Sequence, residues 1–292
     1  MRVMKSLAHQ SSYARSNAGG VFNLLFLGVF AAVMALPMVY TVTNAFKPLD
    51  ELFIFPPPLW VSNPTWNNFA GISSILRESW VPLGRYILNS VFITLGGVIG
   101  QVVFASMAAY VLAKEEFPGR KLLNQVVVLS LMFNGTVTAI PGYIIMAEMG
   151  IVNNHWALIL PACASSLGLF LMRQFMEQMV PTTVLEAARV DGAGELRIFF
   201  RIVMPMCRPA WLTLIILSFQ SLWGNTGGMY IYDEELKTLP YALQNIISGG
   251  TIARSGVSSA VALLLIIPPL VTFILSQSNI LETMSTSGMK DS

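Results

Sequence analysis

The chain has 292 residues, of which 54% are hydrophobic and only 11% are charged, with a mean hydropathy of +0.65. A soluble domain carries about a quarter charged residues, so this chain has too few charges to cover a water-exposed surface. The apolar content excludes intrinsic disorder, the net charge of +2 excludes a nucleic-acid-binding footprint, and two cysteines exclude a disulfide scaffold. The composition therefore predicts a protein embedded in lipid.

Stretches without charged residues that are long enough to cross a membrane occur six times. A helix needs about 20 residues to cross roughly 30 Å of hydrocarbon. The six stretches are residues 16–46, 86–113, 122–147, 149–172, 209–232 and 255–281. Gly135 and Pro141 interrupt the third stretch, as hinges or as ordinary kinks. The sequence therefore predicts an all-α, polytopic membrane protein with six transmembrane helices.

A seventh uncharged stretch, residues 52–76, has the length of a span but not its composition. It is rich in proline and asparagine, which would leave backbone groups of a lipid-exposed helix unsatisfied. We interpret it as an ordered loop outside the membrane, with Trp60 and Trp66 near the headgroups.

Lysine and arginine are distributed unequally between the two sides of the membrane. With a cytoplasmic N-terminus, the inner segments hold twelve of these residues and the outer segments five. Basic residues accumulate on the cytoplasmic side of membrane proteins. The distribution predicts that both termini are cytoplasmic.

The inner loop 173–208 has the pattern of a folded unit. Thr183 and Glu186 have the spacing of a capping box, in which each side chain bonds to a backbone N–H group at the start of a helix. This spacing predicts a short helix over residues 184–190. Asp191-Gly192 supplies a turn, because glycine takes positive φ at little cost. A second helix is predicted over residues 194–203, with one apolar side formed by Leu196, Phe199, Phe200 and Val203. This unit suits a lever that receives force from a partner, and an amphipathic pair lying on the headgroups fits equally well.

Residues 186–205 resemble the EAA signature of ABC importer permeases. Glu186-Ala187-Ala188 is followed after three residues by Gly192 and after nine more by residues 202–205, in which Met204 replaces the usual leucine. Other stretches resemble permeases of the maltose-type carbohydrate uptake family and its complex-oligosaccharide branch: residues 44–48, 56–58, 65–69, 239–240, 266–269 and 282–284.

The resemblance implies an organisation in three parts. Residues 1–85 would hold the cytoplasmic N-terminus, the first transmembrane helix and an extracytoplasmic loop. Residues 86–281 would form the type I ABC importer permease core, with the coupling loop at 181–205, and residues 282–292 a cytoplasmic tail. The implied location is the cell (inner, cytoplasmic) membrane.

The resemblance also implies partners. They are a second permease subunit, usually in a heterodimer, two ABC ATPase subunits and an extracytoplasmic solute-binding lipoprotein, with membrane lipid and no nucleic acid. The sequence contains no G-x-x-x-x-G-K-[ST] loop, so we expect no cofactor in this chain, and ATP and Mg bound by the ATPase subunits. The chain would then be a non-catalytic transport subunit.

By the resemblance to this family, the predicted helix 184–190 would be the coupling helix, which docks into the ATPase. The residues that the resemblance assigns to coupling are Glu186, Ala187, Ala188, Arg189, Asp191 and Gly192. Glu186 would cap the helix, bond to the ATPase, or both, and the two alanines would let the helix approach closely. Arg189 and Asp191 would make polar contacts at the rim, although a solvated surface position fits each of them equally well.

Polar and aromatic residues inside the predicted spans are candidates for lining a sugar path. They are Asn89, Gln101, Phe133, Asn134, Gln220, Trp223 and Asn225. For each residue taken singly, an interhelical hydrogen bond or packing against lipid is the simpler interpretation. The same applies to Gly96 and Gly100 in the second span, whose spacing indicates static close packing of helices.

The function that follows is that of a permease subunit of an ATP-driven importer for a carbohydrate, most simply an oligosaccharide delivered by a binding protein. The spans hold no ionisable residue well inside them, which favours a neutral, polar cargo over ion-coupled transport. The alternatives are a membrane-embedded enzyme acting on glycans or lipids, an ABC permease for another solute class, and a channel or secondary carrier. No HExxH motif or His–Asp–Ser grouping supports the enzyme.

Overall fold

The computed structural model describes residues 17–77, 80–133, 135–248 and 255–287. Throughout these ranges the regular secondary structure is helical, without a strand, which confirms the predicted all-α fold. The α-helices are α2 (Asn17–Phe46), α3 (Leu49–Leu52), α4 (Asn67–Arg77), α5 (Leu83–Lys114), α6 (Arg120–Ser130), α7 (Gly135–Glu148), α8 (Trp156–Cys163), α9 (Ser166–Met179), α10 (Thr182–Val190), α11 (Glu195–Ile198), α12 (Met204–Met206), α13 (Arg208–Trp223), α14 (Leu239–Ser248) and α15 (Ser255–Ser287). The π-helix η2 (Phe199–Val203) and the 3-10 helices η3 (Gly228–Tyr230) and η4 (Glu234–Leu236) complete the elements.

Helices that can cross a membrane account for most of the chain. Among the described residues, four helices are long and apolar enough on their own: Gly20–Phe46, Leu83–Lys114, Trp156–Met179 and Ser255–Ser276. Two bent pairs qualify only as pairs: Arg120–Ser130 with Gly135–Glu148, and Glu195–Met206 with Arg208–Trp223. Counting each pair as one span gives the six that the sequence predicts.

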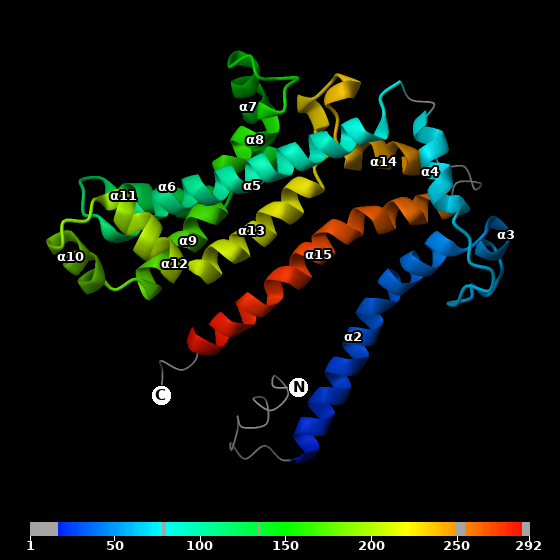
Figure 1. The fold of residues 1–292 in the computed structure, drawn as a ribbon, viewed down its shortest axis with the longest axis horizontal. Coiled ribbons are helices and arrows are strands. Elements are labelled where there is room, and N and C mark those ends of the chain that lie inside the picture. Colours follow the sequence, from blue (N-terminus) through cyan, green and yellow to red (C-terminus); the bar gives the residue numbers. More distant parts are fainter. Residues whose placement is uncertain (1–16, 78–79, 134, 249–254, 288–292) are drawn as a thin grey trace.

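Helix α5 is the central element. It runs along almost the whole molecule, with α10 near its C-terminal end and α14 near its N-terminal end, and α8, α9 and α13 pack against it (Figure 1). Glycines permit this packing: a Cβ atom on Gly96 would lie 3.2 Å from Cδ1 of Ile159, and one on Gly97 would lie 2.5 Å from Cδ1 of Leu222. Backbones approach this closely only where side chains are small, which confirms the predicted packing role of Gly96.

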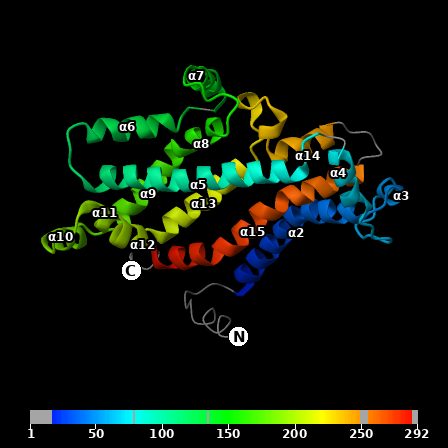
Figure 2. The ribbon, with the colours of Figure 1, turned by 45° about the horizontal axis from the view of Figure 1, so that its top comes forward.

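The third predicted span, 122–147, is broken. Helix α6 ends at Ser130 and α7 begins at Gly135, and the two helices point in different directions (Figure 2). Pro141 lies inside α7, so it does not end a helix there.

The fourth predicted span, 149–172, is displaced along the chain and runs from Trp156 to Met179. Residues with positive φ angles, Gly150 (67°) and Asn153 (61°), precede this helix, so it begins later in the chain than predicted. Arg173, which ended the predicted span, instead lies one turn before Glu177 on α9 and forms an ion pair of 3.7 Å with it. Paired charges one turn apart are compatible with a continuing helix.

The fifth predicted span, 209–232, is shorter than expected. Its straight helix, α13, ends at Trp223, and residues 224–238 form a loop with two short 3-10 helices. Gly227 (φ 81°) and Gly228 (φ 44°) give this loop a backbone path that other residues rarely adopt.

The stretch 52–76 contains no helix long enough to span and is ordered, as predicted, but part of it is helical. Helix α4 occupies its second half. The carboxylate of the buried Glu51 accepts bonds from the backbone N–H groups of Ser62 (2.7 Å) and Asn63 (3.3 Å). The side-chain amide of Asn68 donates to the carbonyl oxygens of Ala45 (2.9 Å) and Lys47 (2.8 Å). Side-chain to backbone bonds therefore fix this loop against the end of α2.

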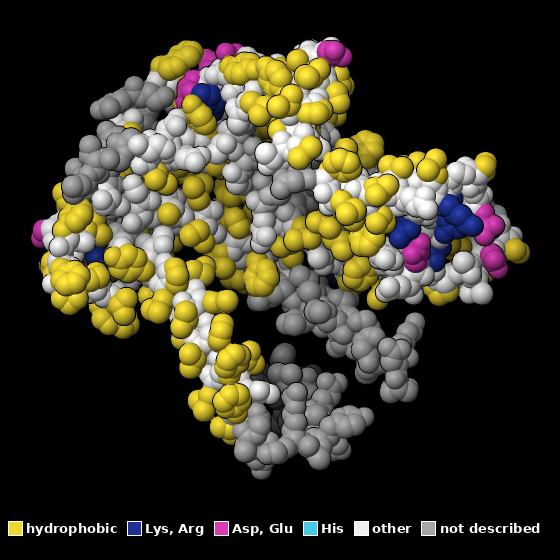
Figure 3. All heavy atoms as spheres, turned by 180° about the vertical axis from the view of Figure 1, so that it is seen from behind, with side chains coloured by type: hydrophobic (Ala, Val, Ile, Leu, Met, Phe, Trp, Pro, Cys, Tyr) yellow, Lys and Arg dark blue, Asp and Glu magenta, His cyan; other side chains and the backbone are white. Residues whose placement is uncertain are grey.

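Helix α2 presents an apolar surface to its surroundings. Every residue from 20 to 40 is exposed, and α2 packs along α15 near its C-terminal end (Figure 1). From behind, hydrophobic side chains cover this helix, whereas Lys, Arg, Asp and Glu side chains gather at the end that carries α10 (Figure 3). This separation of apolar and charged surfaces is typical of a helical protein embedded in a membrane.

Candidate functional site

The loop that carries the EAA motif folds as a compact helix–turn–helix. Helix α10 covers Thr182–Val190, two residues longer than predicted. Gly192 has a φ of 77°, its N–H donates to the carbonyl of Arg189 (3.0 Å), and the N–H of Ala193 donates to the carbonyl of Ala188 (3.0 Å). These two bonds and the left-handed glycine make a Schellman C-cap. The predicted positive φ at Gly192 is therefore confirmed.

The predicted capping box at Thr183 and Glu186 is wrong. Pro181 occupies the N-cap position of α10, and no side chain caps this end. Thr183 is already the second residue of the helix, whereas a capping box requires its first member at the N-cap itself. Glu186 is thus available for contacts other than capping.

Helix α10 has one side facing the protein and another facing outward. Leu185 is only 2% exposed and joins a hydrophobic cluster with residues of α5, α9 and α13, and Ala188 packs on its edge. Glu186 and Ala187 are exposed, and Val190 is 87% exposed. Leu185 therefore anchors the helix to the cluster, and Glu186, Ala187 and Val190 lie on the side that faces away from it.

The second helix of the loop is not the regular helix predicted for 194–203. It comprises α11, the π-helix η2 and α12, and an 81° bend separates it from α13. The π-helix shifts the register of the side chains, so that Ile198, Phe199 and Val203 are buried. Leu196 (65% exposed) and Phe200 (55% exposed), predicted on the same apolar side, face outward.

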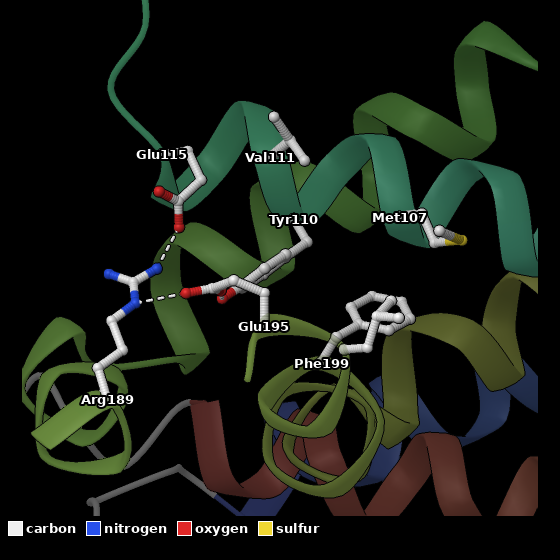
Figure 4. A pocket seen from close by; sticks show the side chains of 8 residues that line it. Met107, Tyr110, Val111, Glu115, Arg189, Glu195 and Phe199 are labelled. Carbon is white, nitrogen blue, oxygen red and sulfur yellow. Dashed lines mark hydrogen bonds and ion pairs between the residues drawn. The ribbon is translucent and has the colours of Figure 1, made fainter. Parts of the chain in front are cut away.

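Arg189 connects α10 to two other helices. Its Nε donates to Oε1 of Glu195 (2.7 Å), and its Nη2 pairs with Oε1 of Glu115 at the end of α5 (Figure 4). The Tyr110 hydroxyl donates to the second oxygen of Glu195 (2.7 Å). The bond to Glu195, followed by the one to Glu115, raises the pKa of Arg189 above its ordinary value. We call Tyr110, Glu115, Arg189 and Glu195 the Arg189 network.

The Arg189 network forms the polar rim of a cavity of about 560 Å³ beside α10. The remaining lining is apolar: Met107, Val111, Leu196 and Phe199. In the described part of the chain, no group of three His, Cys, Asp or Glu residues is placed to hold a metal ion.

The structure distributes the candidate path residues rather than gathering them. Asn89 and Gln101 are buried on α5, Gln220 (exposed) and Trp223 (buried) lie on α13, and Asn225 follows α13. Phe133 follows α6 with 64% of its surface exposed, and Asn134 lies outside the described residues.

Two of these residues support the loop after α13. The side-chain amide of Asn89 donates to the carbonyls of Glu235 (2.7 Å) and Lys237 (2.9 Å). The side-chain oxygen of Asn225 accepts from the N–H of Gly227 (2.9 Å). Trp223 stacks on Phe219 with 5.7 Å between ring centroids. The path roles of all seven residues stay predictions.

Gln101 lines a second cavity, of about 300 Å³, between α5, α9 and α13. Its other polar lining residues, Ser165, Ser218 and Ser221, were missed in the sequence because serines in apolar stretches carry no distinctive pattern. Val190 and the acidic members of the Arg189 network were also missed. A helical projection could have found Val190, since it lies one turn after Glu186 on the outward side of α10.

Comparisons with known proteins agree with this architecture. A family model described as "Binding-protein-dependent transport system inner membrane component" matches residues 101–283. Protein LplC of Bacillus subtilis is 31% identical over 241 residues, which cover 79% of this chain and 77% of LplC. The melibiose/raffinose/stachyose import permease protein MelC of the same organism is 27% identical over 286 residues, which cover 95% of this chain and 99% of MelC.

The fold also matches a solved structure. In the crystal structure of a bacterial ABC transporter involved in the import of the acidic polysaccharide alginate, one chain aligns with a TM-score of 0.79 at 22% identity. The match covers 92% of this chain and 99% of that one. The resemblance carried by the EAA motif is therefore confirmed, and the chain belongs to the family of inner-membrane components of binding-protein-dependent transport systems.

Proposed function

We propose that this chain is a permease subunit of an ATP-driven ABC importer and that α10 is the helix through which a partner ATPase moves it. The observation that carries the proposal is the outward side of α10, where Glu186, Ala187 and the 87% exposed Val190 project from a helix rooted by buried Leu185. A helix that is anchored on one side and exposed on the other can transmit a displacement into the bundle.

The other subunits follow from the family. A second permease subunit, in a heterodimer with this chain, completes the translocation path, and two ATPase subunits bind the ATP and Mg that this chain does not bind. An extracytoplasmic binding lipoprotein delivers the cargo. Both termini and α10 lie on the cytoplasmic side, which the concentration of charged side chains around α10 supports (Figure 3).

The cargo is a carbohydrate, and we propose an oligosaccharide. The name of MelC refers to neutral oligosaccharides and the alginate transporter to an acidic polysaccharide. The cavity lined by Gln101 and three serines offers neutral hydrogen-bonding groups, which favours a neutral sugar.

Reconstitution tests the proposal. The chain is placed in proteoliposomes with the second permease, the ATPase subunits and the binding lipoprotein, and ATP is enclosed with the ATPase. We expect uptake of a neutral labelled oligosaccharide that requires both ATP and the binding lipoprotein. Uptake of only uronic-acid oligosaccharides would contradict the neutral cargo, and uptake by this chain without the ATPase would contradict the importer assignment.

A further inference from the structure

The Arg189 network joins the helix proposed to meet the ATPase to the central helix of the bundle. Arg189 lies on α10, Glu195 is the first residue of α11, and Glu115 and Tyr110 belong to the end of α5 and its last turns. Figure 4 shows the guanidinium between the two carboxylates, pointing from α10 toward the end of α5. Three elements therefore meet at one side chain.

The donors of Arg189 are directed inward. Its Nε and Nη2 atoms are both bonded to carboxylates of the same chain, and Glu195 uses its other oxygen for the hydroxyl of Tyr110. The two carboxylates hold the planar guanidinium in one orientation and tie Arg189 to its own chain, whereas Glu186 lies on the outward side of the helix.

The apolar attachment of α10 is narrow. From this helix, only Leu185 belongs to the buried cluster beneath it, with Ala188 at its edge, among the residues that the structure describes. Two small contacts hold a helix in place but leave it free to tilt relative to α5. The ion pairs of Arg189 with Glu115 and Glu195 restrict that tilt, because charged hydrogen bonds fix direction as well as distance.

From this geometry we infer that Arg189 is a positioning residue that transmits the movement of α10 to α5 through Glu115 and Glu195, and not a contact to the ATPase. The inference rests on the proposed function, since it supposes that α10 is moved by an ATPase. It assigns the rim contact to Glu186 and Val190 and an internal role to Arg189. Glu115, outside the EAA motif, becomes part of the coupling machinery.

The test compares Arg189→Ala, Glu115→Gln and Glu195→Gln in the fully assembled transporter, with Arg197→Ala as matched control. Arg197 is an exposed arginine of the same loop that forms no ion pair within the described ranges. Three quantities are measured: the amount of ATPase that co-purifies, the ATP hydrolysis stimulated by the binding lipoprotein, and the cargo transported per ATP hydrolysed.

We expect all three variants to bind the ATPase as the unmodified chain does, because exposed ion pairs contribute little to folding. Cargo transported per ATP should fall by roughly two- to thirtyfold, the range for substitutions along a coupling connection, and Arg197→Ala should leave it unchanged. The double variant Arg189→Ala/Glu115→Gln should be no worse than Arg189→Ala alone, because both changes break the same link.

Two results would overturn the inference. In the first, Arg189→Ala loses the ATPase while both glutamine variants transport normally, which would make Arg189 a contact to the ATPase. In the second, all three variants transport as much cargo per ATP hydrolysed as the unmodified chain does. If the proposed function itself were wrong, the result would differ from both of these, because no ATPase would co-purify even with the unmodified chain.

Discussion

Gly100 of α5 faces Cys163 of α8 so closely that a Cβ atom on the glycine would lie 2.4 Å from the cysteine Sγ. The Cβ atom of Cys163 would lie 3.8 Å from it, which is an ordinary contact. The sulfur atom therefore fills the space that the missing glycine side chain leaves, and it sets the distance between α5 and α8 at this level.

Gly100→Ala should destabilise the chain by about 1–3 kcal/mol, the usual cost of inserting a methyl group into a packed core. Thermal unfolding of the purified transporter in lipid nanodiscs measures the effect. Gly84→Ala is the control on the same helix, because no atom lies within 4 Å of the Cβ position there.

Adding Cys163→Ala to Gly100→Ala should restore most of the lost stability, because removal of the sulfur leaves only the contact at 3.8 Å. The double variant is compared with each single variant in a thermodynamic cycle. Additive losses would show that the two residues do not share this space.

Gly192→Val should weaken the turn after α10 by about 1–2 kcal/mol, since φ is 77° there and a side chain in this conformation meets its own backbone. No neighbouring atom lies within 4 Å of the new Cβ position, so the cost is purely one of backbone conformation. We expect normal membrane insertion and a loss of transport. Gly194→Ala is the matched control: its φ is −71° and its Cβ position is equally open. Equal transport by the two variants would contradict the role of the turn.

Asn89→Ala should loosen the loop after α13. The side-chain amide of Asn89 donates to the carbonyls of Glu235 and Lys237, and a lost hydrogen bond costs about 0.5–1.5 kcal/mol. Limited proteolysis should therefore cut residues 224–238 faster than in the unmodified chain, while Gln244→Ala, at an exposed position on α14, should not change the rate. Unchanged cleavage together with lost sugar uptake would instead support the predicted place of Asn89 in the path.

The segment between α3 and α4 should lose protection in acid. The N–H group of Ser62, followed by that of Asn63, holds the pKa of the Glu51 carboxyl below 4.5. Since the pKa is lowered on folding, this stabilisation is present above 4.5 and is lost as the pH falls through the folded-state value. Hydrogen-exchange protection factors of Ser62 and Asn63 should fall in that acidic range. In Glu51→Gln, which keeps a single, uncharged acceptor oxygen, they should be lower at neutral pH than in the unmodified chain and independent of pH.

Much of the fold could be predicted because lipid imposes a simple rule on long apolar helices. The first, second and sixth spans and helix α10 lie close to their predicted positions. The end of the fourth span was misplaced because Arg173 was treated as a membrane boundary, although Glu177 pairs with it on the same helix. The prediction for residues 194–203 used the α-helical period of 3.6 residues. Residues 199–203 instead form a π-helix, which turns a different set of side chains toward the core.

The candidate site was predictable in its position but not in its internal bonds. The spacing of the EAA motif locates α10, and the glycine at 192 locates its end. The pairing of Arg189 with Glu115, 74 residues earlier, depends on how α5 and α10 meet in space, which no local pattern in the sequence records.

Photo-crosslinking from α10 tests the central claim most directly. A photoreactive amino acid replaces Val190, which is 87% exposed, and in a matched sample Leu185, which is 2% exposed and on the opposite side of the same helix. Irradiation of the assembled transporter should join position 190 to the ATPase subunit and should give no such product from position 185. Adducts from position 190 to lipid alone, with the ATPase present, would contradict the claim that α10 receives the movement of a nucleotide-hydrolysing partner.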